Sequence, residues 1–469
     1  MENFWDSSVW SWVLILSVLL GGLLVGNIIK KAIPFLRASL IPTSVLGGAV
    51  ILIIEGAYKL ITGDVMFDAP LYGGNGTNVL EIITYHALAL GFIASAFKTT
   101  GTKLGKKRAA EIFNTGATTV STYLLQAIIG FGITMIAALV ITDFFPAAGM
   151  LLPFGYGQGT GQALNYGMIY EADHGFVGGR SFGLAIAALG FISAAVGGVL
   201  HLNVRNKRGK LTYSSRTDGS LHTEKIEGYG EIPMQESVDK LTVQMALIVV
   251  AYGFAYVIMY ALGTLLPNMR SIIFGFNFLL GVLTATLMKL FLNFLRKKKI
   301  IRKKYTNNFL MTRVSNFFFD IMIVAGVAAI RLDSIENYWG IILIVGAAGA
   351  VATYAYTRFI SKALFPDYSE EQFLTMYGML TGTASTGIIL LREIDGDFKT
   401  PASDNMVYQN FPAIVMGFPM MFLATLAPQK PILTMIIFAV FFIVLNIVLF
   451  RSKIFRRRAS KPVENEGDE

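Results

Sequence analysis

The sequence predicts an all-α integral membrane protein with about 11 membrane-spanning helices. Of its 469 residues, 54% are apolar and 15% are charged, whereas about 25% are charged in an average soluble domain. Stretches of about 20 apolar residues, the length that crosses a bilayer, recur along the chain. Nearly all Lys and Arg residues fall in every second loop between these stretches or in the C-terminal tail. This composition excludes a disordered chain, a nucleic-acid-binding domain and an ordinary cytosolic enzyme.

Eleven segments are long and apolar enough to span a membrane. The first has no Lys or Arg before it and is 21 residues long. A signal peptide would begin with basic residues and have a shorter apolar run, so we expect the first segment to be a retained helix. The predicted spans are 9–29, 40–61, 79–97, 114–142, 180–203, 241–264, 271–295, 309–330, 338–364, 407–427 and 431–450.

The positions of the basic residues predict the orientation of the chain. Cytoplasmic loops of membrane proteins are enriched in Lys and Arg. All but five of the 39 Lys and Arg residues fall on one side of the predicted topology. We therefore expect a multi-pass protein of the cell membrane, with its N-terminus outside and its C-terminus in the cytoplasm. The five exceptions are Lys59, Arg180, Arg270, Arg331 and Lys430.

Two Gly-rich segments, 150–170 and 371–392, are apolar only in part and interrupt this alternation. Each must enter and leave the membrane on the same side if the basic residues are to stay together. We expect two re-entrant hairpins, the first from outside and the second from the cytoplasm. Irregular backbone at membrane depth is tolerated where it is buried in protein or lines a wet cavity.

The order of these elements predicts an inverted repeat. Four spans, a hairpin and a fifth span make up 1–203 and again 241–427, with a cytoplasmic linker at 204–240. Because five is an odd number, the second unit is upside down relative to the first. Inverted repeats with broken elements near the midplane are typical of secondary transporters. Residues 428–450 add one helix, and 451–469 form a cytoplasmic tail that is first basic and then acidic.

Both hairpins contain a Gly-Thr core. Residues Gly157, Gln158, Gly159, Thr160 and Gly161 form the first core. Glycines let a backbone approach a ligand closely, and successive N–H groups at the start of a half-helix attract anions. The second core offers hydroxyls and carbonyls suited to Na⁺ and a carboxylate, and the alternative is that the glycines only allow tight packing. Its candidates are Gly382, Thr383, Ser385 and Thr386.

Few ionisable residues lie within the predicted spans. Asp320 is one, and it is either functional or paired with Arg313. Its counterpart in the repeat is His86, which is more often a hydrogen-bonded core residue than a ligand. Arg392 follows the second hairpin and could neutralise a carboxylate or simply anchor the helix at the cytoplasmic side. Asn165, Thr381 and, more weakly, Asp320 are the candidate Na⁺ ligands.

These motifs resemble those of the bacterial sodium/glutamate symporter family over about residues 1–427. The family's Ile-Pro…Gly-Gly motif resembles Ile41 to Gly48, and its Gly-Gly-His-Gly-Thr-Gly hairpin resembles Gly155 to Gly161. The resemblance implies Na⁺-coupled uptake of L-glutamate, a ten-helix core and a homodimer. It also implies that a part carrying the hairpins moves against a scaffold part. Here Gln158 replaces the family's His, and Met420 to Phe422 replace its polar residue near the end of the tenth helix.

Other functions fit the same pattern. A carboxylate transporter with another substrate would keep both hairpins, and a cation/proton antiporter would use Asp320 and His86. A channel and a membrane-embedded enzyme are more distant alternatives.

An enzyme would need a nucleophile–base pair near one membrane face, so we expect no enzymatic activity and no cofactor apart from the coupling ion. We expect no nucleic-acid partner. Three of the four His residues lie at or beyond the predicted membrane edges: His174, His201 and His222.

Overall fold

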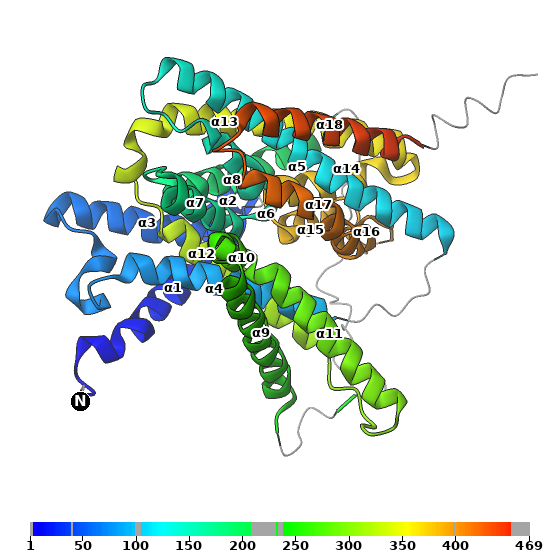
Figure 1. The fold of residues 1–469 in the computed structure, drawn as a ribbon, viewed down its shortest axis with the longest axis horizontal. Coiled ribbons are helices and arrows are strands. Elements are labelled where there is room, and N and C mark those ends of the chain that lie inside the picture. The colour runs from blue at the N-terminus through cyan, green and yellow to red at the C-terminus, as the bar shows by residue number, and fades with distance from the viewer. Residues whose placement is uncertain are drawn as a thin grey trace, which may run out of the picture.

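The chain folds into helices, as its composition predicts (Figure 1). The structure is a computed structural model, and it describes residues 3–38, 41–98, 105–207, 231–232, 238–396 and 399–451. Within these ranges there is no strand beyond an isolated bridge between Glu231 and Lys304. Most of the predicted linker and nearly all of the predicted tail lie outside the described residues.

Eighteen α-helices and six short 3₁₀-helices make up the described chain. The α-helices are α1 (Ser7–Ala32), α2 (Pro34–Ala38), α3 (Thr43–Thr62), α4 (Gly76–Phe97), α5 (Lys106–Val140), α6 (Leu151–Gln158), α7 (Thr160–His174), α8 (Gly179–Lys207), α9 (Lys240–Leu265), α10 (Arg270–Gly275), α11 (Asn277–Lys297), α12 (Asn308–Ala328), α13 (Trp339–Leu364), α14 (Ser369–Thr381), α15 (Ala384–Arg392), α16 (Ala402–Tyr408), α17 (Asn410–Ala424) and α18 (Pro431–Leu449). The 3₁₀-helices are η1 (Met66–Asp68), η2 (Pro70–Tyr72), η3 (Pro146–Met150), η4 (Pro267–Met269), η5 (Asp333–Tyr338) and η6 (Pro366–Tyr368).

Ten helices in the described residues are long and apolar enough to cross a membrane, and they follow the order of the predicted spans. The predicted span 407–427 is different, because α16 and α17 meet there at an angle of 52°. Counting this bent pair as one span gives the eleven that the sequence predicts. The chain therefore has the architecture of a multi-pass helical membrane protein.

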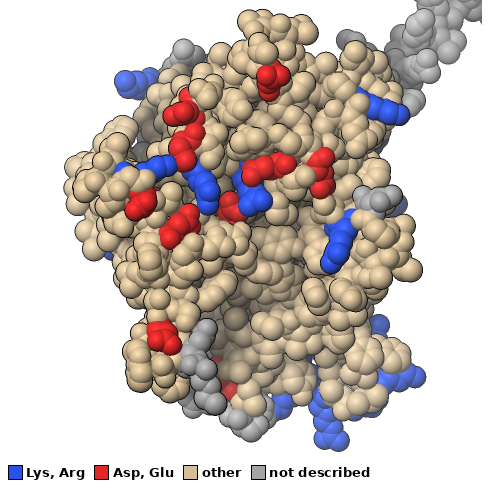
Figure 2. Space-filling model, turned by 60° about the vertical axis from the view of Figure 1, so that its left-hand side comes forward, with Lys and Arg blue, Asp and Glu red and all other residues tan. Residues whose placement is uncertain are grey.

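The outward surface of these helices is apolar. Exposed large side chains recur along α1, α9, α11 and α18. Figure 2 shows one face of the molecule, on which broad areas carry no charged side chain and the charged residues gather in bands. In water such a surface would be costly. In a bilayer it is the expected lipid-facing surface, because lipid tails are as apolar as the side chains.

Two groups of helices can be distinguished by their packing. In the α4–α12 group, α4 packs along α12, α1 on α3, and α9 on α11. This group comprises α1–α4 and α9–α12. In the α5–α13 group, α5 packs against α13, α17 and α18, while α8 packs against α7, α6 and α13. It comprises α5–α8 and α13–α18. Figure 1 shows α1, α4 and α9 on its lower side and α5, α13 and α18 on its upper side.

Ion pairs tie the helix ends together at two opposite ends of the bundle. At one end, Lys59 pairs with Asp333 at 3.1 Å and Arg180 with Glu81 at 2.6 Å. These bonds join the end of α3 to η5 and the start of α8 to the start of α4. At the other end, Lys107 at the start of α5 pairs with a residue of η6 at 3.5 Å. We call this second end the basic end, because α5 begins and α11 ends there with Lys and Arg residues.

Backbone contact between glycines sets how closely α5 approaches the segment before α6. A Cβ on Gly149 would lie 1.9 Å from the carbonyl oxygen of Gly130 in α5. A real Cβ cannot occupy that position, so η3 packs directly on the α5 backbone. This contact positions α6, which begins at Leu151.

We expect Gly149→Ala to destabilise the protein by about 2 kcal/mol or more, because the backbones must separate to admit a methyl group. Thermal unfolding of the purified protein in detergent measures this. Gly21→Ala is the matched control, since nothing lies within 4 Å of its Cβ. The control variant should be as stable as wild type or up to about 1 kcal/mol more stable, because alanine favours a helix more than glycine does. Equal unfolding temperatures for the two variants would contradict the close approach.

Candidate functional site

A cavity of about 220 Å³ lies between the two groups of helices. The α4–α12 group supplies one wall from α4, α11 and α12, with Pro42 and Ser44 next to them. The α5–α13 group supplies the opposite wall from α5, α6, α14, α15 and α17. Much of the lining is apolar, and its polar side chains are few. These are Ser44, Ser95, Thr119, Tyr123, Gln158, Asp320, Thr383, Gln409 and Asn410.

Two helix breaks face this cavity, and both fall in the predicted hairpin cores. The first separates α6 from α7 at Gly159, whose φ of +80° favours glycine. The second separates α14 from α15 at Gly382 and Thr383. Gly157 and Gln158 line the cavity at the first break, and Gly382 and Thr383 line it at the second. The structure therefore brings together residues more than 200 positions apart in the sequence.

The first break is held by contacts from both groups. Tyr123 of α5 donates a hydrogen bond to the carbonyl oxygen of Gly157 at 3.0 Å. A Cβ on Gly157 would lie 2.0 Å from the Tyr123 ring, so only glycine fits. Thr160 donates to the carbonyl of Met322 in α12 at 3.2 Å. Gly161 lets Leu88 approach closely. Gly159, Thr160 and Gly161 thus support the break without being part of the cavity lining.

The second break is stabilised by a helix cap. The Thr383 hydroxyl accepts a hydrogen bond from the backbone N–H of Thr386 at 3.2 Å, which caps α15. The two threonine hydroxyls lie 3.1 Å apart. Thr381 is buried and donates to the carbonyl of Tyr377 at 2.7 Å. Ser385 belongs to α15, but its side chain lies outside the described residues.

The charge lining the cavity comes from one side chain and from helix ends. Asp320 is the only ionisable carboxylate among the described lining residues, and none of them is Lys, Arg or His. The N-termini of α7 and α15 begin at the two breaks. A helix N-terminus carries partial positive charge and unpaired N–H groups. Ala384 at the start of α15 lines the cavity, whereas the first residues of α7 do not. The cavity therefore offers one anionic group for a cation and one positive helix end for anions.

Other predicted site residues lie away from the cavity lining. Arg392 is exposed at the C-terminal end of α15. Asn165 is buried in α7, and its amide donates to Gln162 at 3.1 Å and to the carbonyl of Gly275 at 3.2 Å. His86 contacts the hydroxyl of Tyr252 in α9 at 2.8 Å.

Arg313, the alternative ion-pair partner of Asp320, contacts an aromatic ring. The guanidinium of Arg313 lies over the Phe309 ring, 5.0 Å from its centre. Asp320 itself lines the cavity together with Ser44. This placement favours the interpretation of Asp320 as a site residue over that of a structural ion pair with Arg313.

Six polar lining residues escaped the sequence-based prediction: Ser44, Ser95, Thr119, Tyr123, Gln409 and Asn410. Thr119 belongs to a run rich in Thr and Ser in α5, whose buried hydroxyls were a usable signal. Gln409 and Asn410 fall inside the predicted span 407–427. A pair of amides inside an apolar stretch marks a polar surface that must face protein or water rather than lipid.

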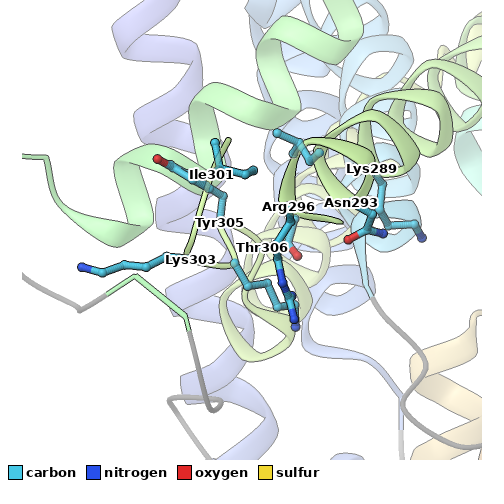
Figure 3. Close-up of a pocket in the computed structure, with 9 residues that line it drawn as sticks. Lys289, Asn293, Arg296, Ile301, Lys303, Tyr305 and Thr306 are labelled. Carbon is cyan, nitrogen blue, oxygen red and sulfur yellow. The ribbon is translucent and has the colours of Figure 1, made fainter. Parts of the chain in front are cut away.

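A second, much smaller pocket lies at the basic end, between the end of α11 and the segment after it. It has a volume of only about 10 Å³, and Lys289, Arg296 and Lys303 line it. Figure 3 shows Lys303 pointing away from the other labelled side chains. The Lys289 ammonium donates to the carbonyls of Ala96 and Lys98 at 2.5 and 3.1 Å, so it caps the end of α4. The role of Lys289 in this small pocket is therefore to cap α4, and we do not consider the pocket a ligand site.

The start of α14 is anchored by a half-buried carboxylate at the basic end. Glu370 binds Arg205 of α8 and Arg358 of α13. His201 of α8 contacts the same carboxylate at 2.9 Å and the hydroxyl of Tyr354 at 2.7 Å. Burial acts to raise the pKa of Glu370, but the hydrogen bonds from His201 and Arg358 and the nearby positive charges outweigh it and lower the pKa to about 2. Glu370 is therefore ionised at neutral pH and joins three helices.

We expect Glu370→Gln to lower stability by about 2 kcal/mol, because it leaves half-buried positive charge without its partner. Since the pKa of Glu370 is lower in the folded state, its stabilising effect is complete above its ordinary pKa of 4.5 and is lost as pH falls toward about 2. Thermal unfolding should therefore show the same deficit at about pH 6 and about pH 8. Glu336→Gln, an exposed carboxylate in η5, is the control. A deficit present at only one pH would contradict this role.

Comparison with protein-family models and with curated protein sequences finds no match to this chain. Within the described ranges, no group of three or more His, Cys, Asp and Glu side chains could hold a metal ion. What the fold and cavity define is a class: a multi-pass helical membrane protein with a partly polar internal cavity where two helices are broken.

Proposed function

We propose that the chain is a secondary active transporter that takes up L-glutamate or a closely related carboxylate together with Na⁺ by alternating access. The observation that carries this proposal is the cavity between two groups of helices, with a helix break on its wall at each Gly-Thr core. Discontinuous helices that meet at a site between repeats are typical of secondary transporters.

An inverted repeat is supported by the exchange of packing partners between the two halves. We propose that α1, α3, α4, α5 and α8 correspond to α9, α11, α12, α13 and α17. Under this correspondence, α4 packs on α11 just as α12 packs on α3. Likewise, α8 packs on α13 and α17 packs on α5. The α4–α12 and α5–α13 contacts then join each helix to its own counterpart.

Two re-entrant hairpins are supported by contacts between the segments that flank each break. The rings of Phe145, before α6, and Phe176, after α7, stack with centres 4.6 Å apart. At the basic end, Asn405 of α16 donates to the hydroxyl of Tyr368, just before α14, at 2.9 Å. Each broken pair thus starts and finishes in one neighbourhood. With the basic end in the cytoplasm, the first hairpin opens outside, the second opens inside and the N-terminus is outside.

The chemistry of the cavity suits an amino acid with acidic groups. The N-terminus of α15, with Thr383 beside it, would bind a carboxylate, and the Gln158 amide at the first break offers further hydrogen bonds. Asp320 would pair with the substrate ammonium group or with Na⁺. Backbone carbonyls that have no intrahelical partner at the ends of α6 and α14 are further candidate oxygen ligands for the ion, apart from those of Gly157 and Leu380, which accept bonds from Tyr123 and Gln126. Glutamate and Na⁺ are specified by the family resemblance, and so is a homodimer.

Transport requires that the cavity open alternately to the two sides. The cavity lies on the boundary between the α4–α12 group and the α5–α13 group. Movement of one group against the other would carry the helix breaks across the membrane. We propose that the α5–α13 group, which contains both breaks, is the moving part.

A cation/proton antiporter is the second candidate, because Asp320 is a carboxylate within the cavity. His86 lies on the α9 side of α4, where it contacts Tyr252, and does not line the cavity. The antiporter would thus depend on Asp320 alone. Asp320→Asn should abolish proton-coupled exchange in an antiporter.

Purified protein in liposomes should accumulate labelled L-glutamate when an inward Na⁺ gradient is applied, and not without one. We expect Thr383→Ala to weaken the apparent affinity for glutamate about tenfold, since it removes the cap of α15 and a hydroxyl from the cavity. Thr264→Ala is the control, because Thr264 is exposed on α9 and bonds only its own helix.

The control should transport like wild type. Gradient-driven uptake that Thr383→Ala leaves unchanged would contradict the site but not the function. No glutamate uptake by wild type, together with uptake of aspartate or citrate, would replace the substrate. No uptake of any of them would overturn the proposed function.

A further inference from the structure

A third irregularity faces the same cavity, at the bend between α16 and α17. The two helices meet at 52°, and Gln409 lies between them. Both Gln409 and Asn410 line the cavity. The bend therefore places two adjacent amides on the wall formed by the α5–α13 group, where a straight apolar span is expected from the sequence.

Gln409 is fixed by bonds on both atoms of its amide. It is 2% exposed. Its Oε1 accepts a hydrogen bond from the Thr119 hydroxyl of α5 at 2.9 Å. Its Nε2 donates to Oδ1 of Asn410 at 3.0 Å, and its contact with the Met379 sulfur is long, at 3.5 Å. The amide of Gln409 thus connects α5 to Asn410 in one orientation.

This arrangement leaves Asn410 with donors to offer. Its Oδ1 is already occupied by Gln409. Within the described part of the chain its Nδ2 makes no hydrogen bond, and the residue is exposed although it lies on the cavity wall. The side chain does not cap α17, since no side-chain hydrogen bond caps that helix. An amide held in this way presents two N–H donors to a bound molecule.

We propose that Asn410 determines specificity by binding the side-chain carboxylate of the substrate through Nδ2, and that Thr119 and Gln409 position it. This inference rests on the proposed function. The bond from Gln409 to Oδ1 fixes which end of the Asn410 amide is the donor, and its two N–H donors suit a carboxylate, a group with acceptors only. A carboxamide offers these donors one oxygen where a carboxylate offers two. Asn410 therefore favours glutamate over glutamine.

Asn410→Asp tests this assignment because it changes one amide into an anion of the same shape. Uptake of labelled glutamate and of labelled glutamine is measured in liposomes under the same Na⁺ gradient. A charge-assisted hydrogen bond is lost and repulsion replaces it, so the preference for glutamate over glutamine should fall by about tenfold or more. Glutamine uptake should be retained or rise.

Two further variants make the result specific. Asn337→Asp adds the same charge at an exposed position in η5 and should keep the wild-type ratio. Thr119→Val removes the hydroxyl that holds Gln409, and it should shift the ratio in the same direction as Asn410→Asp but by less. It also tests the assignment if Asn410→Asp does not elute as a single folded species in size-exclusion chromatography.

The outcomes separate this inference from the function on which it rests. If wild type takes up glutamate and both site variants keep the wild-type ratio, the role of Asn410 is wrong and the transport function stands. If both substrates fall equally, Asn410 is structural and the assignment is also wrong. If wild type takes up neither substrate, the proposed function fails first and the assignment fails with it.

Discussion

Backbone amides cannot be left unpaired in an apolar medium, and the helix breaks at Gly159 and Gly382 depend on how that constraint is met. At the first break, Tyr123 takes up a freed carbonyl, and Thr160 fixes the start of α7 to α12. At the second, Thr383 takes up a freed N–H. Gly157 and Gln158 at the first break and Gly382 and Thr383 at the second line the cavity. Part of the polar character of the cavity therefore comes from breaking helices inside a membrane protein.

The rest of the bundle holds these breaks in place. Glycine contacts such as Gly130 with Gly149 bring α5 against the segment that leads into α6. At the basic end, Glu370 holds the start of α14 against α8 and α13 through half-buried charges. The outer ends of the broken helices are thus attached to the bundle, while their inner ends lie at the cavity. The two groups of helices share the cavity, so a ligand there contacts both and can bias their relative position.

The cavity combines one carboxylate, several neutral amides and hydroxyls, and the N-terminus of α15. An arrangement without Lys, Arg or His in its described lining would bind anions through dipoles rather than through full charges. Such binding is weaker and more reversible than a buried ion pair with Arg, which suits the transporter that we propose. Neutral amides such as those of Gln409 and Asn410 select by the direction of their hydrogen bonds, not by charge.

The sequence by itself determined the helical class, the order of the spans and the position of both breaks, because span length and Gly-Thr composition are local properties. It also singled out Asp320, Gln158 and Thr383, since polar residues in apolar stretches stand out. Only the tertiary structure decided that these residues share one cavity with Thr119 and Gln409, while Asn165, His86 and Arg392 face elsewhere. Which side of a helix faces the cavity depends on packing between helices distant in the sequence. The bend at Gln409, by contrast, has a local signal, because Pro412 has no N–H to bond the carbonyl of Tyr408.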